Sequence, residues 1–177
     1  NLERAGKQLS LTIPLTIVIV FVFLFMLFKN FKDTLVTLTC IVFALTGGIT
    51  ALLIRGYNFN VSAGVGFVSI FGISVMAGVL LVSALNREVY ASNLTLRAVV
   101  QKIAGEQFRA ILMMLIVAII GLIPAATSKG IGSDVQRPLA TVIIGGLTST
   151  LIFTPIIIPA LFYWVTKQKT KKYGNEK

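Results

Sequence analysis

The chain has 177 residues, of which 56% are hydrophobic, and its mean hydropathy is +0.91. Soluble domains have about 45–50% apolar residues, so this composition points to a membrane protein. Histidine is absent, and Cys40 is the single cysteine. The composition therefore excludes His-dependent catalysis, His or Cys-cluster metal sites and an internal disulfide.

Five long stretches without charged residues follow one another along the chain, at 11–28, 34–54, 61–86, 110–128 and 138–166. Each has about the 18–20 residues that a helix needs to cross the hydrocarbon of a bilayer. Lipid supplies no water to backbone amides, so such segments must be helical. The sequence predicts an all-α fold, a polytopic membrane bundle of five transmembrane helices over 11–166. No ionisable side chain is expected inside any span.

The net charge of +10 is distributed over the segments between the spans. Alternate segments share a side of the membrane, and one side holds 11 of the Lys and Arg residues against 5 on the other. The positive-inside rule puts the richer side, with the 167–177 tail, in the cytoplasm. Lipid, and not nucleic acid, is the expected partner of these charges. The expected topology anchors are Arg109, Lys167, Lys169, Lys171 and Lys172.

This orientation leaves residues 1–10 outside, as the expected end of a periplasmic domain that this chain lacks. Between the third and fourth spans, the spacing of apolar and charged residues predicts an amphipathic helix at 92–106 on the cytoplasmic membrane surface. The outer loop 129–137 is rich in glycine. Ser133 or Asp134 is expected to cap the last helix, with Pro138 in its first turns.

Small residues four positions apart recur in the spans, as in Ala44/Gly48, Gly47/Ala51 and Gly145/Ser149. They allow helix backbones to approach closely, which replaces the hydrophobic drive that lipid does not supply. The glycines expected at helix contacts are Gly47, Gly48, Gly64, Gly66, Gly78, Gly145 and Gly146. Prolines lack an amide donor, so kinks are expected at Pro124, Pro155 and Pro159.

Three segments carry a resemblance to a known family: Phe-Ala-Leu-Thr-Gly-Gly at 43–48, Ser-Ala-Gly-Val-Gly-Phe at 62–67, and the run 135–146. They resemble the final membrane segments of resistance-nodulation-division (RND) efflux pumps, closest to the heavy-metal branch. The resemblance implies the last five of twelve spans of an inner-membrane permease. It further implies proton-driven export of heavy-metal cations or small toxic compounds, by a homotrimer with a periplasmic adaptor and an outer-membrane channel.

Two positions depart from the family pattern. Where the heavy-metal branch usually has a polar residue, often Asn, this chain has Ala77, and where the family has a relay threonine it has Met114. Both positions are interpreted as degenerate proton-relay sites. Hydroxyls remain in the spans and are expected mainly to bond backbone carbonyls, at Thr46, Ser69, Ser74 and Ser83.

A second class of function fits these departures: a non-transporting membrane scaffold, or a remnant that has lost proton coupling. A small-molecule channel is disfavoured because no polar stripe is expected through the spans. A thioether path for soft cations along Met26, Met76, Met113 and Met114 is disfavoured because methionine in membrane helices usually fills space. No enzyme is expected, since the sequence offers no nucleophile–base pair, and no catalytic, cofactor-binding or metal-binding residue is assigned.

Overall fold

The computed structural model describes the backbone of residues 2–91, 95–130 and 132–173, and the side chains from Pro14 to Thr166 within these ranges. This part of the chain is all-helical. Its five helices are α1 (Leu2–Phe28), α2 (Phe31–Arg55), α3 (Val61–Ala91), α4 (Leu96–Thr127) and α5 (Ser133–Tyr173).

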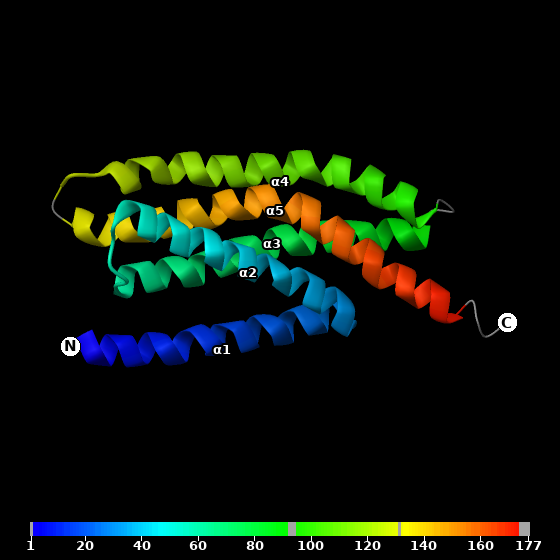
Figure 1. The fold of residues 1–177 in the computed structure, drawn as a ribbon, viewed down its shortest axis with the longest axis horizontal. Coiled ribbons are helices and arrows are strands. Elements are labelled where there is room, and N and C mark those ends of the chain that lie inside the picture. The colour runs from blue at the N-terminus through cyan, green and yellow to red at the C-terminus, as the bar shows by residue number, and fades with distance from the viewer. Residues whose placement is uncertain (1, 92–94, 131, 174–177) are drawn as a thin grey trace.

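The helices run up and down along the long axis of the molecule (Figure 1). The N-terminus and the α2–α3 and α4–α5 connections lie at one end of the bundle. The α1–α2 and α3–α4 connections and the C-terminal end of α5 lie at the other. Segments that were expected to share a side of the membrane therefore share an end of the bundle.

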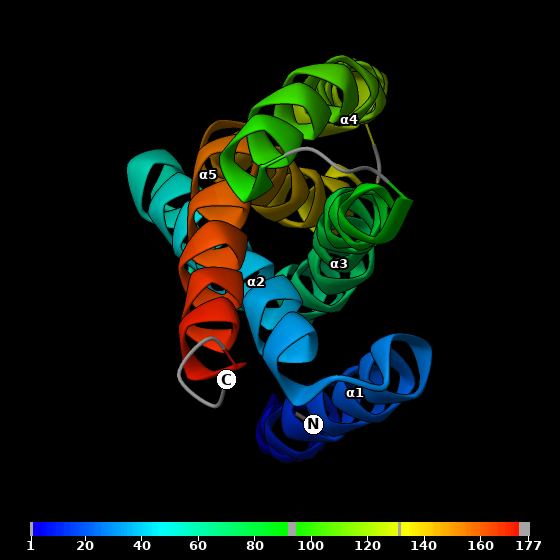
Figure 2. The ribbon, with the colours of Figure 1, turned by 90° about the vertical axis from the view of Figure 1, so that its right-hand side faces the viewer.

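Helix α5 is the centre of the packing. Viewed along the bundle, it lies among α2, α3 and α4, while α1 lies to one side (Figure 2). Its most extensive contacts are with α2, followed by α4 and α3, whereas α1 contacts α2 and α3. Large side chains fill the interior, including Ile70, Phe71 and Leu81 of α3 and Leu147 and Phe162 of α5, each 3% exposed or less.

Four helices are long and apolar enough to cross a membrane: Phe31–Arg55, Val61–Ala91, Leu96–Thr127 and Ser133–Thr166. In α1 the apolar segment with described side chains, Pro14–Phe28, is shorter, so the fifth span stays a prediction. The outer surface of the bundle is apolar too, with Leu53, Val117 and Ile156 each more than 65% exposed. Large exposed apolar surfaces of this kind mark contacts with a membrane or with other protein.

A separate surface helix was expected at 92–106, and in the structure the part of this region from Leu96 onward belongs to a longer helix. Residues 92–94 lie outside the described part, and from Leu96 a single helix continues to Thr127. Its first turns are part of the bundle, because Val99, Val100 and Ile103 are buried in the common core. The apolar side of these turns therefore contacts protein, where the sequence suggested a membrane surface.

Two helix ends also differ from expectation. Helix α5 begins at Ser133, and the Gly132 carbonyl accepts hydrogen bonds from Val135 N (3.1 Å) and Gln136 N (3.4 Å). The capping position is thus Gly132, whereas Ser133 or Asp134 was expected. Gly132 has φ +87°, a conformation that glycine adopts without steric cost. Helix α2 begins at Phe31, three residues before the expected span, and this earlier start brings Asp33 into the helix.

The prolines do not interrupt the helices. Helix α4 contains Pro124, and α5 contains Pro155 and Pro159. Helix α5 changes direction in its orange part, the region of these two prolines, and its last turns diverge from α4 (Figure 1). Proline removes one intrahelical hydrogen bond and crowds the carbonyl four residues earlier, which accounts for the bend.

Candidate functional site

Polar side chains are buried along the interfaces of α2, α3 and α5. They extend from the end of the bundle near Lys29 to the opposite end near Arg55. The buried polar residues of this row are Asp33, Thr34, Thr37, Ser74, Thr141, Thr150 and Thr154. The sequence-based expectation that no polar stripe runs through the spans is therefore wrong for the described residues. We call this set the polar row.

The polar row begins at Asp33, which is 7% exposed in the first turn of α2. Its Oδ2 accepts hydrogen bonds from Asn30 Nδ2 at 3.2 Å and from Asn86 Nδ2 at 3.0 Å. Asn30 precedes α2, whereas Asn86 comes from α3, 53 residues after Asp33. Two carboxamide donors thus compensate a buried carboxylate, as burial of a charge requires.

The expectation was that no ionisable side chain lies inside a span, and the second span was expected to begin at residue 34. Helix α2 begins at Phe31, so it includes the buried Asp33. The predicted span began directly after Asp33 because the apolar stretch begins at Thr34. The pattern Asn30-x-x-Asp33 ahead of an apolar run is a signal of a helix start, and an acid in the first turn of a helix is favoured by the helix dipole. Nothing in the sequence indicated that Asn86 would contact Asp33.

Hydroxyls continue the polar row toward the middle of the bundle. Thr37 donates to the Asp33 carbonyl at 2.9 Å, and Thr154 Oγ1 lies 3.7 Å from Cys40 Sγ. Ser74 Oγ and Thr150 Oγ1 lie 3.0 Å apart and both side chains are fully buried, so α3 and α5 share a hydrogen bond inside the bundle. Thr150 also bonds the Gly146 carbonyl at 2.9 Å.

The four hydroxyl side chains named from the sequence have different partners in the structure. Thr46 and Ser69 bond backbone carbonyls of their own helices, as expected. Ser74 instead pairs with a side chain of another helix, because Thr150 lies opposite it. Ser83 is exposed.

At the opposite end of the bundle, Arg55 links three helices. Its Nη1 donates to the Ala126 carbonyl near the end of α4 at 2.9 Å, and to Thr141 Oγ1 of α5 at 3.4 Å. Nearby, Arg137 Nε donates to the Ser128 carbonyl. These bonds satisfy carbonyl groups near the end of α4, which have no amide partner within the helix.

Ala77 and Met114, the two positions interpreted as degenerate relay sites, lie on different helices. Ala77 is fully buried one turn after Ser74 on α3, and Met114 is half-buried on α4, against the common core. Met26, Met76 and Met113 are each more than 55% exposed on the outer surface, so these three side chains do not line an internal path.

Glycines lie where α2 and α5 cross. A Cβ built on Gly47 would be 2.5 Å from the Gly145 carbonyl oxygen, and one on Gly145 would be 2.6 Å from the Gly47 carbonyl oxygen. Both distances are too short for any side chain, so the two backbones are in direct contact. Gly146 and Gly48 have similarly little room, against Ile70 and Phe67 of α3. Gly64 is buried.

Gly66 and Gly78 bring α3 against its neighbours. A Cβ on Gly66 would be 3.1 Å from the Leu139 carbonyl oxygen of α5, and one on Gly78 would be 2.9 Å from Cys40 Sγ of α2. Close backbone approach makes the polar row a tightly packed contact between helices. This contact holds the carboxylate of Asp33 and the hydrogen bonds described above.

The sequence of residues 1–166 matches the family described as AcrB/AcrD/AcrF. The chain belongs to this family. Its resemblance to the heavy-metal branch of the RND efflux pumps is confirmed by the relatives that it matches. It is 38% identical over 170 residues to the nickel and cobalt resistance protein CnrA of Cupriavidus metallidurans, and 40% identical over 161 residues to the cobalt-zinc-cadmium resistance protein CzcA of the same organism.

These alignments cover 96% and 91% of this chain but only 16% and 15% of CnrA and CzcA. The chain therefore spans about a sixth of the length of the curated relatives it matches. The fold agrees: a crystal structure of a heavy metal efflux pump superposes with a TM-score of 0.83 at 39% identity, over 93% of this chain and 16% of that pump. The relatives are efflux proteins and not enzymes, in line with the class expected from the sequence.

Proposed function

We propose that this chain is the C-terminal membrane part of a heavy-metal efflux permease in the bacterial inner membrane, which exports metal cations or small toxic compounds by proton antiport. The observation that carries the proposal is the match to CnrA, CzcA and a heavy metal efflux pump over more than 90% of the chain. The fold match to that pump has a TM-score of 0.83.

The proposed arrangement has five spans, with α1 as the first of them. Residues 1–10 continue into a periplasmic domain, and the end of the bundle that carries Lys29, Arg87 and the 167–177 tail lies in the cytoplasm. The positive-inside rule supports this orientation. The side chains of the anchors Lys167, Lys169, Lys171 and Lys172 lie outside the described residues.

The partners proposed for the chain are the lipid bilayer, the N-terminal half of the permease, and two further copies of the same protein in a trimer. A periplasmic adaptor and an outer-membrane channel complete the assembly. These partners follow from the family, of whose curated members this chain spans about a sixth of the length.

Proton coupling is proposed to be weak. Ala77 and Met114 provide no polar group where the family places its relay, and a proton in hydrocarbon requires a polar partner. This observation also favours the second candidate, a scaffold or remnant that assembles but does not pump. In both cases the polar row serves helix association, because its hydroxyls are already bonded.

A chimaera tests the proposal and separates the two candidates. The matching segment of CzcA is replaced by this chain, and growth of a metal-sensitive strain is measured in cobalt, zinc and cadmium. We expect resistance above that of cells without a pump, and a further gain from Ala77→Asn with Met114→Thr. If the chimaera reaches the membrane in normal amounts and neither version confers resistance, the scaffold is the correct function.

A further inference from the structure

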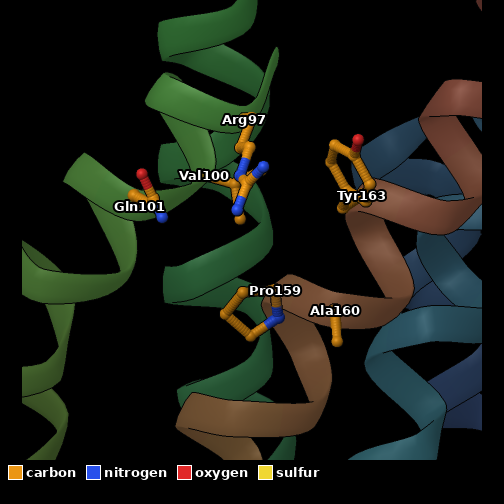
Figure 3. A pocket seen from close by; sticks show the side chains of 6 residues that line it. All are labelled: Arg97, Val100, Gln101, Pro159, Ala160 and Tyr163. Atoms are coloured by element: carbon orange, nitrogen blue, oxygen red, sulfur yellow. The ribbon is translucent and has the colours of Figure 1, made fainter.

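A hollow of about 370 Å³ lies between α4 and α5 at the basic end of the bundle, and no function discussed above uses it. Figure 3 shows Arg97, Val100 and Gln101 on the α4 side and Pro159, Ala160 and Tyr163 on the α5 side. We call it the fork pocket. From its position and chemistry we infer that the fork pocket binds the head group of an anionic phospholipid.

The fork pocket exists because α5 diverges from α4. Pro159 lies in its wall, and a proline at this position cannot donate to the carbonyl of residue 155, so α5 bends here. In Figure 1 the last turns of α5 diverge from the beginning of α4. The residues that line the pocket come from these two parts of the chain. Val100 and Pro159, both buried, give it an apolar floor.

The level of the fork pocket along the bundle is that of a membrane surface. Tyr163 lines it, and the next residue, Trp164, is 62% exposed on the outside of α5. Tyrosine and tryptophan concentrate at the boundary between hydrocarbon and head groups. In the sequence, Lys167 follows three residues after Trp164, which is typical of the passage into water. A phosphate diester of a lipid lies at this depth.

The charge of the fork pocket is complementary to a phosphate. Arg97 extends between the two helices in Figure 3, and no carboxylate among the described residues pairs with it. The nearby carboxylate of Glu88 pairs with Lys102 at 2.8 Å. Gln101 adds a carboxamide donor. A guanidinium group next to buried apolar side chains matches an anionic phospholipid. The guanidinium can bind its phosphate, and the apolar side chains can contact its acyl chains.

This inference rests on the chain's spanning a membrane and not on transport, so a pump that fails to move metal leaves it intact. The test uses purified protein in detergent, titrated with phosphatidylglycerol or phosphatidylcholine and observed by native mass spectrometry. We expect phosphatidylglycerol to bind in preference, and Arg97→Gln to weaken its binding about fivefold. Arg87→Gln is the matched control, because Arg87 is exposed at the same end but does not line the pocket.

A second variant tests the shape of the site and keeps its charge. Ala160→Phe fills the fork pocket with a larger side chain from an exposed position, so it should reduce phosphatidylglycerol binding and leave the fold intact. Equal losses from Arg97→Gln and Arg87→Gln, or no loss from Ala160→Phe, would overturn the inference in favour of general surface attraction. Competition by millimolar inorganic phosphate would equally overturn it, since the site would then bind a soluble anion.

Discussion

The side-chain amide of Asn86, near the end of α3, donates a hydrogen bond of 3.0 Å to the carboxylate of Asp33 in the first turn of α2. This contact joins two helices through a buried charge. Removing a donor from a buried carboxylate is costly, because the charge keeps its desolvation penalty and loses a partner. The contact therefore stabilises one particular arrangement of α2 and α3.

We expect Asn86→Leu to lower the free energy of unfolding by about 1.5–3 kcal/mol, since hydrogen bonds to charged groups fall in this range. Chemical denaturation of the purified protein in detergent measures the loss. Ser83→Leu, at an exposed position on the same helix, is the control and should change little. Adding Asp33→Leu to Asn86→Leu should restore part of the stability. A double variant as unstable as the sum of the two single variants would show that the residues are not coupled.

Glycine-to-alanine changes should have opposite signs at two kinds of position. In Gly145→Ala the new Cβ meets the Gly47 carbonyl oxygen at 2.6 Å, so α2 and α5 must separate and stability should fall by about 1–3 kcal/mol. In Gly72→Ala the Cβ has no neighbour within 4 Å, and the better helix propensity of alanine should leave stability unchanged or raise it by up to about 1 kcal/mol. Thermal unfolding in detergent compares the two, and similar melting temperatures for both variants would contradict the close crossing.

The proposed orientation is testable with cysteines in a Cys40→Ala background. The exposed Lys129 represents the outer end of the bundle, and the exposed Lys32 represents the opposite end. An impermeant thiol reagent added to intact cells should label Lys129→Cys and spare Lys32→Cys. Permeabilised cells should show labelling of both, which confirms that each cysteine is reactive. The reverse pattern in intact cells would invert the topology.

The buried pair of Ser74 and Thr150 should contribute measurably to the contact of α3 and α5. Thr150→Val keeps the shape of the side chain and removes its hydroxyl, and Ser74→Ala removes the other partner. A double-mutant cycle of unfolding free energies should give a coupling of about 0.6 kcal/mol and at most about 1.7 kcal/mol, the range of such bonds in membrane helices. Zero coupling would mean that each hydroxyl is satisfied by its own helix.

The amino-acid sequence predicted five long apolar helices approximately where α1 to α5 lie, and which ends of the bundle they share. It also predicted a separate helix at 92–106, which in the structure is part of α4 from Leu96 onward. Length and apolarity decide this in a membrane, because lipid leaves a helix as the only way to satisfy the backbone. Helix boundaries were less certain: α2 begins three residues before its apolar stretch, and α4 extends back to Leu96, because helices continue through polar residues when side chains or the bundle satisfy them.

The packing of the helices against one another decides which side chains are buried in the bundle and which lie on its outside. Ile70 is fully buried and Ile54 is 86% exposed, yet both stand in stretches of equal apolarity. In water the polar face of a helix marks its exposed side, but lipid is as apolar as a protein core, so the sequence pattern carries no such mark. For the same reason the partners of Asp33 and Ser74, 53 and 76 residues away, were determined by helix packing alone.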